Sequence, residues 1–278
     1  MLFIINPISG KVTKSRIIEY LRGKGLKVVC TEYPGHAERL AREATERTIV
    51  AIGGDGTINE VARGIVGTEK VLGIIPRGSG DGLALHLGIS RNYKRALKTI
   101  LNGKVQKIDS GVINERPFFS VCGIGFDALV SERFAKSGKR GLINYLRLGL
   151  KTWRDYSPEK YKVDIDGESF EIDASLITVG NSSQWGNNAM IAPRADISDG
   201  ILDMTVVDRF STMNLPSLGI LLMTGNLDKN NHVYCYRGRN IKISRMISGP
   251  AHADGDWFST GTEVNISILP HSLNILVP

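Results

Sequence analysis

The chain has 278 residues, which fits one large domain or two modest ones. Its 35 Lys and Arg residues outnumber its 28 Asp and Glu residues, and the net charge of +7 favours anionic partners without choosing among them. The three cysteines are far apart, which argues against a zinc site and favours reduced thiols in a cytoplasm. No apolar run approaches the roughly 20 residues that span a bilayer, so we expect a soluble or peripheral protein.

The first hundred residues alternate between strand-like and helix-like segments. Strands are expected at 2–6, 26–31, 48–54 and 70–76, and helices at 13–23, 35–48 and 57–66. This order predicts an α/β domain with a parallel sheet over residues 1–104. Beyond it, alternating segments and an Asp166-Gly167 turn predict a β-rich antiparallel domain over 105–278, whose last strand is a candidate to pack back on the first domain.

The second part interrupts its strands with three helix-like stretches. They are 127–136, 141–154 and 212–223. A turn is expected at Asn114-Glu115, and the last two strands are expected at 263–269 and 273–277.

The strongest motif follows the third expected strand, where Gly-Gly-Asp-Gly-Thr occupies residues 53–57 and a helix begins at once. The three glycines let the backbone approach an anion, and the amides of the helix N-terminus favour phosphate. We expect Thr57 and Glu60 to form a capping box, and Asp55 to act through Mg²⁺ or a water bound to it. A plain capped turn explains Gly56, Thr57 and Glu60, but not the two further glycines and the aspartate.

A second glycine-rich loop, Pro-Arg-Gly-Ser-Gly-Asp-Gly at 76–82, follows the next strand. Open α/β sheets bind ligands at the carboxyl ends of their strands, where both loops are expected. Ser79 can donate its hydroxyl to a phosphate, and Arg77 can add charge. Taken alone, the segment also fits a solvated loop. The segment 6–11 ends the first strand similarly, and Thr31 ends the second.

The ordered set of motifs resembles the diacylglycerol kinase-like lipid kinases, which include bacterial diacylglycerol kinases, YegS-type lipid kinases and sphingosine kinases. The matching stretches are NPISG, GGDGTINEV, PRGSGDGLA, GIGFDA, IAPRADISDGILD and ADGD. The GGDGT motif alone is less specific, because NAD kinases and phosphofructokinases resemble it there. The resemblance implies a nucleotide-binding N-terminal domain of the NAD kinase and phosphofructokinase type, followed by a lipid-binding domain.

The resemblance further implies that ATP and Mg²⁺ bind at residues from several strand ends. These residues are Asn6, Thr31, Gly53, Gly54, Asp55, Gly56, Thr57, Asn59, Glu60 and Ser79. The family's DGE motif reads Asp254-Gly255-Asp256 here, so that one aspartate takes the proton of the lipid hydroxyl and the other helps to arrange Mg²⁺. Asp55 joins them as a catalytic candidate. Without the resemblance, the same three residues fit a turn.

The segment 191–203 resembles the family's structural Mg²⁺ loop. The resemblance implies the carboxylates of Asp196 and Asp199 and the carbonyl of Ile201 as ligands, a mixed oxygen set that suits Mg²⁺. From the residues alone, an acidic turn before a strand fits equally well. In GIGFDA, the resemblance implies that Asp127 lies near the phosphates.

Two positions depart from the family's pattern. The second loop of the family usually has Asn where this chain has Asp81, which cannot donate a hydrogen bond and is repelled by phosphate. Asp256 is one methylene shorter than the family's Glu, so the choice of base between Asp254 and Asp256 is left open.

We therefore expect a cytoplasmic, peripheral kinase that transfers the γ-phosphoryl group of ATP to a lipid hydroxyl, with the loop at Asp55 and the aspartate pair meeting at one triphosphate. Basic and apolar residues over 136–154 suit an anionic membrane surface or a packed helix with a solvated face. The alternatives are an NAD kinase-like enzyme and a non-catalytic nucleotide- or lipid-binding protein. No motif supports nucleic acid. The lipid, diacylglycerol or a sphingoid base among others, and the oligomeric state, with a homodimer as one option, are open.

Overall fold

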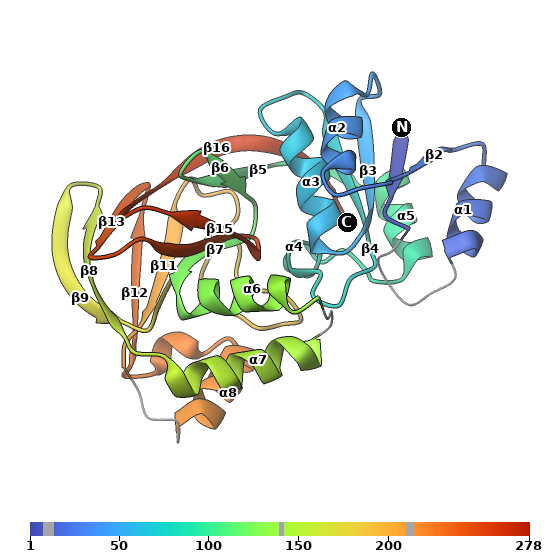
Figure 1. The fold of residues 1–278 in the computed structure, drawn as a ribbon. Coiled ribbons are helices and arrows are strands. Elements are labelled where there is room, and N and C mark those ends of the chain that lie inside the picture. The colour runs from blue at the N-terminus through green and yellow to red at the C-terminus, as the bar shows by residue number, and fades with distance from the viewer. Residues whose placement is uncertain (8–13, 139–141, 210–213) are drawn as a thin grey trace. The chain divides into compact units, whose positions relative to one another are not determined.

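The computed structural model describes residues 1–7, 14–138, 142–209 and 214–278, which form two compact units (Figure 1). The first unit contains residues 1–109 and 271–278, and the second contains residues 110–270.

The first unit is built on a parallel sheet. Its strands are β2 (Lys27–Cys30), β1 (Leu2–Ile5), β3 (Thr48–Gly53), β4 (Val71–Pro76) and the closing part of β16 (Glu263–Val277), in that spatial order. β1, β3 and β4 are almost wholly buried, as expected for apolar strands covered on both faces. The predicted parallel α/β sheet is confirmed, and it is extended by the pairing of Asn274 with Val71.

Five helices within the described residues accompany this sheet. They are α1 (Lys14–Gly23), α2 (His36–Glu43), α3 (Asp55–Ile65), α4 (Gly82–His86) and α5 (Tyr93–Asn102). α2 ends before the predicted residue 48 because Ala44 is extended. It packs closely on α3, since a Cβ on Gly64 would lie 2.5 Å from the Glu38 carbonyl oxygen. The sequence reading missed α5, whose N-cap Asn92 accepts hydrogen bonds from two amides of the first turn.

The second unit contains two antiparallel sheets. One has the order β12 (Val233–Gly238), β11 (Leu202–Val207), β10 (Leu176–Gly180), β7 (Val121–Gly125), β14 (Gly249–Ala253) and β15 (Asp256–Thr260). The other combines the first half of β16 with β13 (Asn240–Arg245), β8 (Glu159–Ile165) and β9 (Glu168–Ala174), and β5 (Lys104–Ile113) and β6 (Arg116–Phe118) join it beside β16. Side chains from both sheets share one core, including Ile124, Ile177, Val163 and Ile243. The predicted β-rich antiparallel fold is confirmed.

Backbone turns of this unit follow the sequence expectation at two places. Asn114 and Glu115 both have positive φ, and so do Asp166 and Gly167, as tight hairpins require. The end of the chain differs from the expectation of two strands, because β16 runs as one strand of 15 residues. A single left-handed residue, His271 with φ 51°, bends it without ending it.

In the part of the second unit that the structure describes, three helices complete the fold. They are α6 (Phe126–Lys136), α7 (Leu142–Asp155) and α8 (Leu215–Thr224), and a short 3₁₀ turn follows at Leu227–Lys229. Residues 212 and 213 of the predicted helix 212–223 lie outside the described residues. No helix in the described part of the chain has the length and apolar character to cross a membrane.

Candidate active site

The candidate nucleotide residues lie at one edge of the first sheet. β1, β2, β3 and β4 are parallel, so their carboxyl ends share an edge, and Asn6, Thr31, Gly53 and Ser79 lie at or just beyond these ends. β2 lies on one side of β1, and the chain then crosses to the other side of β1 to form β3. This reversal makes a topological switch point between β1 and β3. Open α/β sheets bind ligands at such a point.

Backbone hydrogen bonds fix where each loop leaves the sheet. The Asn6 amide donates to the Ile52 carbonyl at 3.1 Å, and the Thr31 amide donates to the Ile5 carbonyl at 2.9 Å. The structure thus brings Asn6, Thr31, the 53–60 segment and Ser79 together at the carboxyl edge of this unit.

The carboxylate of Asp55 joins the two glycine-rich loops. Its Oδ2 accepts from the Asp81 amide at 2.9 Å, and its Oδ1 accepts from the Gly82 amide at 2.8 Å. Burial raises the pKa of Asp55, while these amides favour the ionised form. Each oxygen still has a lone pair for a water or an ion, so Asp55 both holds the second loop and keeps capacity for a further contact.

The glycines of this edge divide into two kinds. A Cβ on Gly78 would lie 2.6 Å from the Gly54 Cα, and one on Gly54 would lie 3.0 Å from the Gly78 Cα, so the two loops touch backbone to backbone. Gly56 is different, because a Cβ there would meet nothing within 4 Å and the residue is exposed. Packing within the described residues does not explain the glycine at position 56, whereas close approach of a ligand would.

The start of α3 corrects the predicted capping box. The helix begins at Asp55 with Gly54 as N-cap, and no side chain caps it. Glu60 instead accepts a hydrogen bond from the Ala37 amide at 3.1 Å, in the first turn of α2. Thr57 is 5% exposed and packs against Gly53. Asn59 is buried, and its Nδ2 has no hydrogen-bond partner within the described ranges, so this donor is left for a water or a ligand.

In the second unit, the Asp254-Gly255 pair forms the tight turn between β14 and β15. Both residues have positive φ, at 51° and 85°. Asp254 Oδ1 accepts from the Ser120 and Val121 amides at 2.8 and 3.0 Å, and Oδ2 accepts from the Phe119 amide at 2.8 Å. Burial raises the pKa of Asp254 to about 6, against these three amides, which lower it. One lone pair remains on Oδ2.

The other acid of this turn has a different environment. Asp256 begins β15 and is exposed, and its negative charge contributes to the raised pKa of Asp254. The turn expected without the resemblance is therefore present, and it carries a half-buried carboxylate next to an exposed one.

A buried hydrogen-bond chain connects this turn to α6. His252 Nδ1 accepts from the Gly255 amide at 3.3 Å, which leaves the proton on Nε2, and Nε2 lies 3.1 Å from Asp127 Oδ2. Asp127 Oδ2 also accepts from the Thr178 hydroxyl at 2.6 Å, and Oδ1 accepts from the Ala128 amide. His252 and Asp127 have side chains only 3% and 4% exposed, so the chain is shielded from water.

Asp127 also lines an apolar cavity of about 250 Å³ within the second unit. Its walls come from α6, α7, α8, β10, β11, the loop between these two strands and the 3₁₀ turn, and they include Trp153, Trp185, Leu176 and Leu222. The cavity opens beside Leu150, which lines it and is nevertheless 65% exposed. Such a lining excludes water and suits a hydrocarbon chain.

In the predicted metal turn at 196–201, amide and hydroxyl groups of the turn donate hydrogen bonds to the two carboxylates. Asp196 Oδ1 accepts from the amide and the hydroxyl of Ser198, and Asp199 Oδ1 accepts from the Ile201 amide. Asp199 Oδ2 pairs with Arg237. A magnesium ion would compete with Arg237 for Asp199, so the ligand set of Asp196, Asp199 and the Ile201 carbonyl stays a prediction, and we assign no catalytic step to it.

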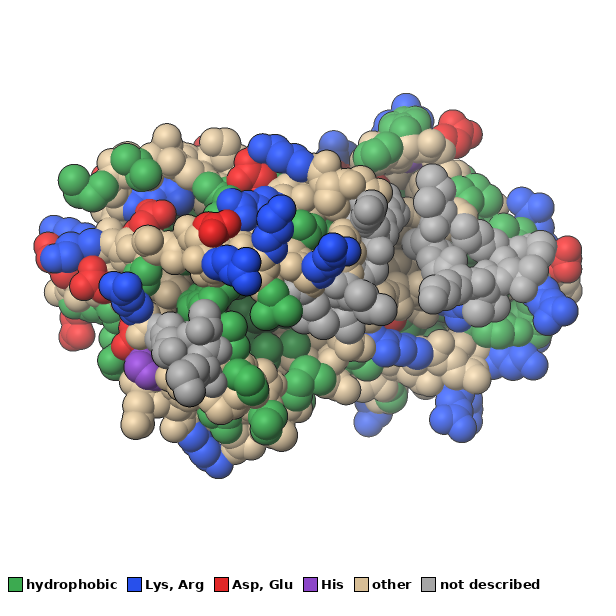
Figure 2. Space-filling model, turned by 60° about the horizontal axis from the view of Figure 1, so that its bottom comes forward, with side chains coloured by type: hydrophobic (Ala, Val, Ile, Leu, Met, Phe, Trp, Pro, Cys, Tyr) green, Lys and Arg blue, Asp and Glu red, His purple; other side chains and the backbone are tan. Residues whose placement is uncertain are grey.

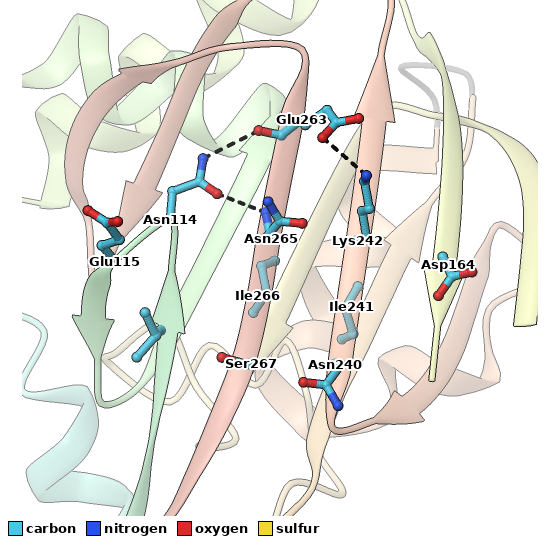
Figure 3. Close-up of a pocket in the computed structure, with 11 residues that line it drawn as sticks. Asn114, Glu115, Asp164, Asn240, Ile241, Lys242, Glu263, Asn265, Ile266 and Ser267 are labelled. Carbon is cyan, nitrogen blue, oxygen red and sulfur yellow. Dashed lines mark hydrogen bonds and ion pairs between the residues drawn. The ribbon is translucent and has the colours of Figure 1, made fainter. Parts of the chain in front are cut away.

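A larger groove of about 640 Å³ crosses the other sheet of the second unit (Figure 3). Its polar walls are already paired, with Lys242 3.1 Å from Glu263 and the Asn114 side chain accepting from the Asn265 amide. Compared with the apolar cavity, it offers little to a lipid.

Sequence reasoning missed two contributors to these sites. Arg91, which binds Asp81, belongs to no motif and lies ten residues beyond its partner. The apolar cavity is assembled from segments that lie far apart in the sequence, so no local pattern of residues marks it.

Comparison with known families matches both parts of the chain. Residues 1–113 match the family described as "Diacylglycerol kinase catalytic domain", and residues 120–277 match the "YegS C-terminal NAD kinase beta sandwich-like domain". A diacylglycerol kinase of Mycobacterium tuberculosis (strain H37Rv) is 30% identical over 99% of this chain and 94% of its own length. A protein of Enterobacter sp. (strain 638) named "Probable lipid kinase YegS-like" is 29% identical over 100% of this chain and 95% of its own length.

Solved structures share the fold. A diacylglycerol kinase from Bacillus anthracis str. Sterne superposes with a TM-score of 0.77 at 20% identity, over 100% of this chain and 96% of that one. An NAD kinase from Archaeoglobus fulgidus, solved in complex with ATP, superposes with a TM-score of 0.55 at 14% identity, over 99% of this chain and 93% of that one. At these identities the likeness describes the fold.

Proposed function

This chain belongs to the diacylglycerol kinase and YegS-type lipid kinase family, and on that premise we propose that it transfers the γ-phosphoryl group of ATP to a hydroxyl group of a lipid. One observation carries the proposal. The apolar cavity reaches Asp127, which is hydrogen-bonded through His252 to the turn that holds Asp254. A site for a hydrocarbon chain and a candidate base therefore lie at two ends of one buried hydrogen-bond chain.

The nucleotide end of the reaction rests on the first unit. The exposed backbone at Gly56, the unpaired Asn59 donor and the switch point between β1 and β3 support binding of the ATP phosphates there. ATP enters such sites with Mg²⁺, which neutralises the charge that develops on the phosphates. Asp55 then keeps the two loops in register and offers its remaining lone pairs to the ion or to water bound to it.

Asp254 is the better candidate for the base. Its carboxylate is held by three backbone amides, so its position is fixed, and a lone pair on Oδ2 remains to accept the proton of the lipid hydroxyl. Positioned bases contribute about 10² to 10⁴ in rate. Asp256 is exposed and acts through its charge, which favours the protonated form of Asp254.

The cavity favours a neutral hydroxyl lipid over a sphingoid base. A sphingoid amine is a cation and needs an anion when it leaves water. Among the described lining residues, Asp127 is the one carboxylate, and three hydrogen bonds already occupy most of its acceptor capacity. A diacylglycerol-like headgroup carries no charge and makes no such demand.

The face around the cavity entrance fits a membrane surface. Ile220 on α8 is 64% exposed and Leu150 on α7 is 65% exposed. Figure 2 shows apolar side chains gathered on the face that carries these two helices. Arg147, Lys151 and Arg154 of α7 are exposed as well, so an anionic bilayer would meet both apolar and cationic side chains. We infer peripheral attachment at the cytoplasmic surface, from which the lipid enters the cavity.

A cavity-filling variant tests the lipid assignment. Gly219 lines the cavity from α8, and a Cβ there meets nothing within 4 Å, so Gly219→Phe is compatible with the backbone. We expect the KM for a short-chain diacylglycerol to rise about tenfold or more, with the affinity for ATP unchanged. Ser217→Phe, at an exposed position of the same helix, is the matched control. Unchanged lipid kinetics in Gly219→Phe would remove the cavity from the proposal.

A further inference from the structure

The second glycine-rich loop contains a buried carboxylate that phosphate binding would not predict. Asp81 is 1% exposed and has φ 49°, in the left-handed region. Its Oδ1 accepts from the Gly78 amide at 2.8 Å, and its own amide donates to Asp55. Two carboxylates thus lie next to each other at the edge where the triphosphate is proposed to bind. Without a compensating positive charge, the two carboxylates would repel the triphosphate.

Arg91 supplies the compensating charge. Its Nε lies 3.1 Å from Asp81 Oδ2, and its side chain is 44% exposed, so the arginine covers the buried acid from the solvent side. Ion pairs of Lys or Arg with exposed carboxylates contribute little to stability. This pair is different, because it joins an exposed guanidinium to a carboxylate that water scarcely reaches.

The same guanidinium also fixes the direction of the loop's peptide groups. Arg91 Nη2 donates to the Gly80 carbonyl at 2.9 Å and to the Ser79 carbonyl at 3.3 Å. In a trans peptide the N–H points away from the C=O. Binding of the Gly80 carbonyl therefore directs the Asp81 amide away from Arg91, and that amide donates to Asp55.

The same rule applies one residue earlier. With the Ser79 carbonyl held by Arg91, the Gly80 amide points away from the guanidinium. The amides of residues 77, 78, 81 and 82 have partners within the unit. The Gly80 amide is thereby oriented as a donor at the loop's tip.

We propose that Arg91 is a positioning residue for the nucleotide, which neutralises Asp81 and orients the 79–80 peptide so that the loop presents a donor instead of a net negative charge. The inference rests on the proposed ATP site, and it adds a residue outside every motif of the chain. Arg91 acts through Asp81 and the loop backbone, without itself touching the phosphates.

The test is a double-mutant cycle of Arg91 and Asp81, in which the affinity for ATP is measured. With Arg91→Met, we expect the Kd for ATP in MgCl₂, measured by calorimetry, to rise at least about tenfold, because a charged hydrogen bond is lost and Asp81 is left unpaired. Adding Asp81→Asn should recover most of the affinity, since the Asn oxygen still accepts from the Gly78 amide and no charge remains. Arg91→Lys, which keeps the charge and loses the fork geometry, should fall between.

If the double variant binds ATP as weakly as Arg91→Met does, the proposal that Arg91 compensates the charge of Asp81 is wrong. If Arg91→Met does not fold, recovery of a folded protein by Asp81→Asn supports the pair, and failure to recover it contradicts the pair. Urea unfolding separates this inference from the kinase proposal. If the wild-type protein binds no ATP, the proposed nucleotide site is wrong. The pairing of Arg91 with Asp81 is then still tested by whether Asp81→Asn restores the free energy of unfolding that Arg91→Met loses.

Discussion

Gly56 is a glycine that the packing of the described residues does not require. Gly54 and Gly78 are explained by the contact between their Cα atoms, whereas a Cβ at Gly56 would meet open space. The residue lies in the first turn of α3, where Ala is a better helix former by about 0.5–1 kcal/mol.

This difference gives a prediction in which stability and binding move in opposite directions. Gly56→Ala should leave the free energy of unfolding unchanged or slightly higher, and should weaken ATP binding about tenfold or more if the phosphates approach this backbone. Gly149→Ala, at another helical glycine with open space, is the control for both measurements. Unaltered ATP affinity in Gly56→Ala would place the phosphates elsewhere.

The raised pKa of Asp254 gives a second prediction, on pH. Its folded pKa of about 6 lies above the ordinary value of 3.8, so the base is protonated as pH falls through about 6, and kcat/KM should fall with it. Asp256→Asn removes a charge that raises this pKa and should move the acid limb to lower pH. An acid limb that stays in place in Asp256→Asn would contradict the coupling of the two acids.

Asp254→Asn needs a separate control, because the side chain also holds three amides. The Asn nitrogen cannot accept from the Phe119 amide, so stability should fall by about 1–3 kcal/mol. A loss of about 10² to 10⁴ in kcat, measured where the variant is still folded by its melting curve, would identify the base. A smaller loss in kcat would indicate that Asp254 stabilises the turn and is not the base.

Among the elements, α7 and α8 connect the cavity with the proposed bilayer contact. Leu150→Ser combined with Ile220→Ser should lower the partitioning onto vesicles of phosphatidylglycerol and phosphatidylcholine by about tenfold, since two large apolar side chains lose their transfer to the bilayer. Met246 and Ile247 are also exposed apolar residues of the second unit, at 86% and 67%, but they lie in the loop after β13. The variant with Ser at both of these positions is the control. If it loses as much vesicle partitioning as the Leu150 and Ile220 variant, the face of α7 and α8 is not a specific membrane contact.

The elements also show where sequence patterns sufficed. Continuous apolar runs marked β1, β3 and β4, because both faces of a parallel sheet are covered. The hairpin was predictable from the Asp166-Gly167 pair, because these residue types accept the positive φ that the turn has in the structure. The capping box failed, because Glu60 binds the amide of Ala37 in α2, a contact between helices that the local motif cannot encode.

At the scale of the whole molecule, motifs indicated the candidate residues, but the structure supplied their contacts. The glycines of segment 53–57 predict a phosphate loop, which stays a prediction. The attachment of Asp55 to the amides of Asp81 and Gly82 depends on two strands that lie side by side. Likewise, His252 and Asp127 are 125 residues apart in the sequence and meet only through the pairing of β14 with β7. Contacts of this kind carry no local signal.

The whole account depends on where the γ-phosphoryl group of ATP goes. The purified protein should be incubated with γ-labelled ATP, Mg²⁺, a mixed lipid extract and NAD, followed by extraction into chloroform. We expect label in a chloroform-soluble product, with diacylglycerol preferred over sphingosine when each is supplied alone. Label in NADP, or no transfer at all by a protein that binds ATP, would contradict the proposed lipid kinase activity.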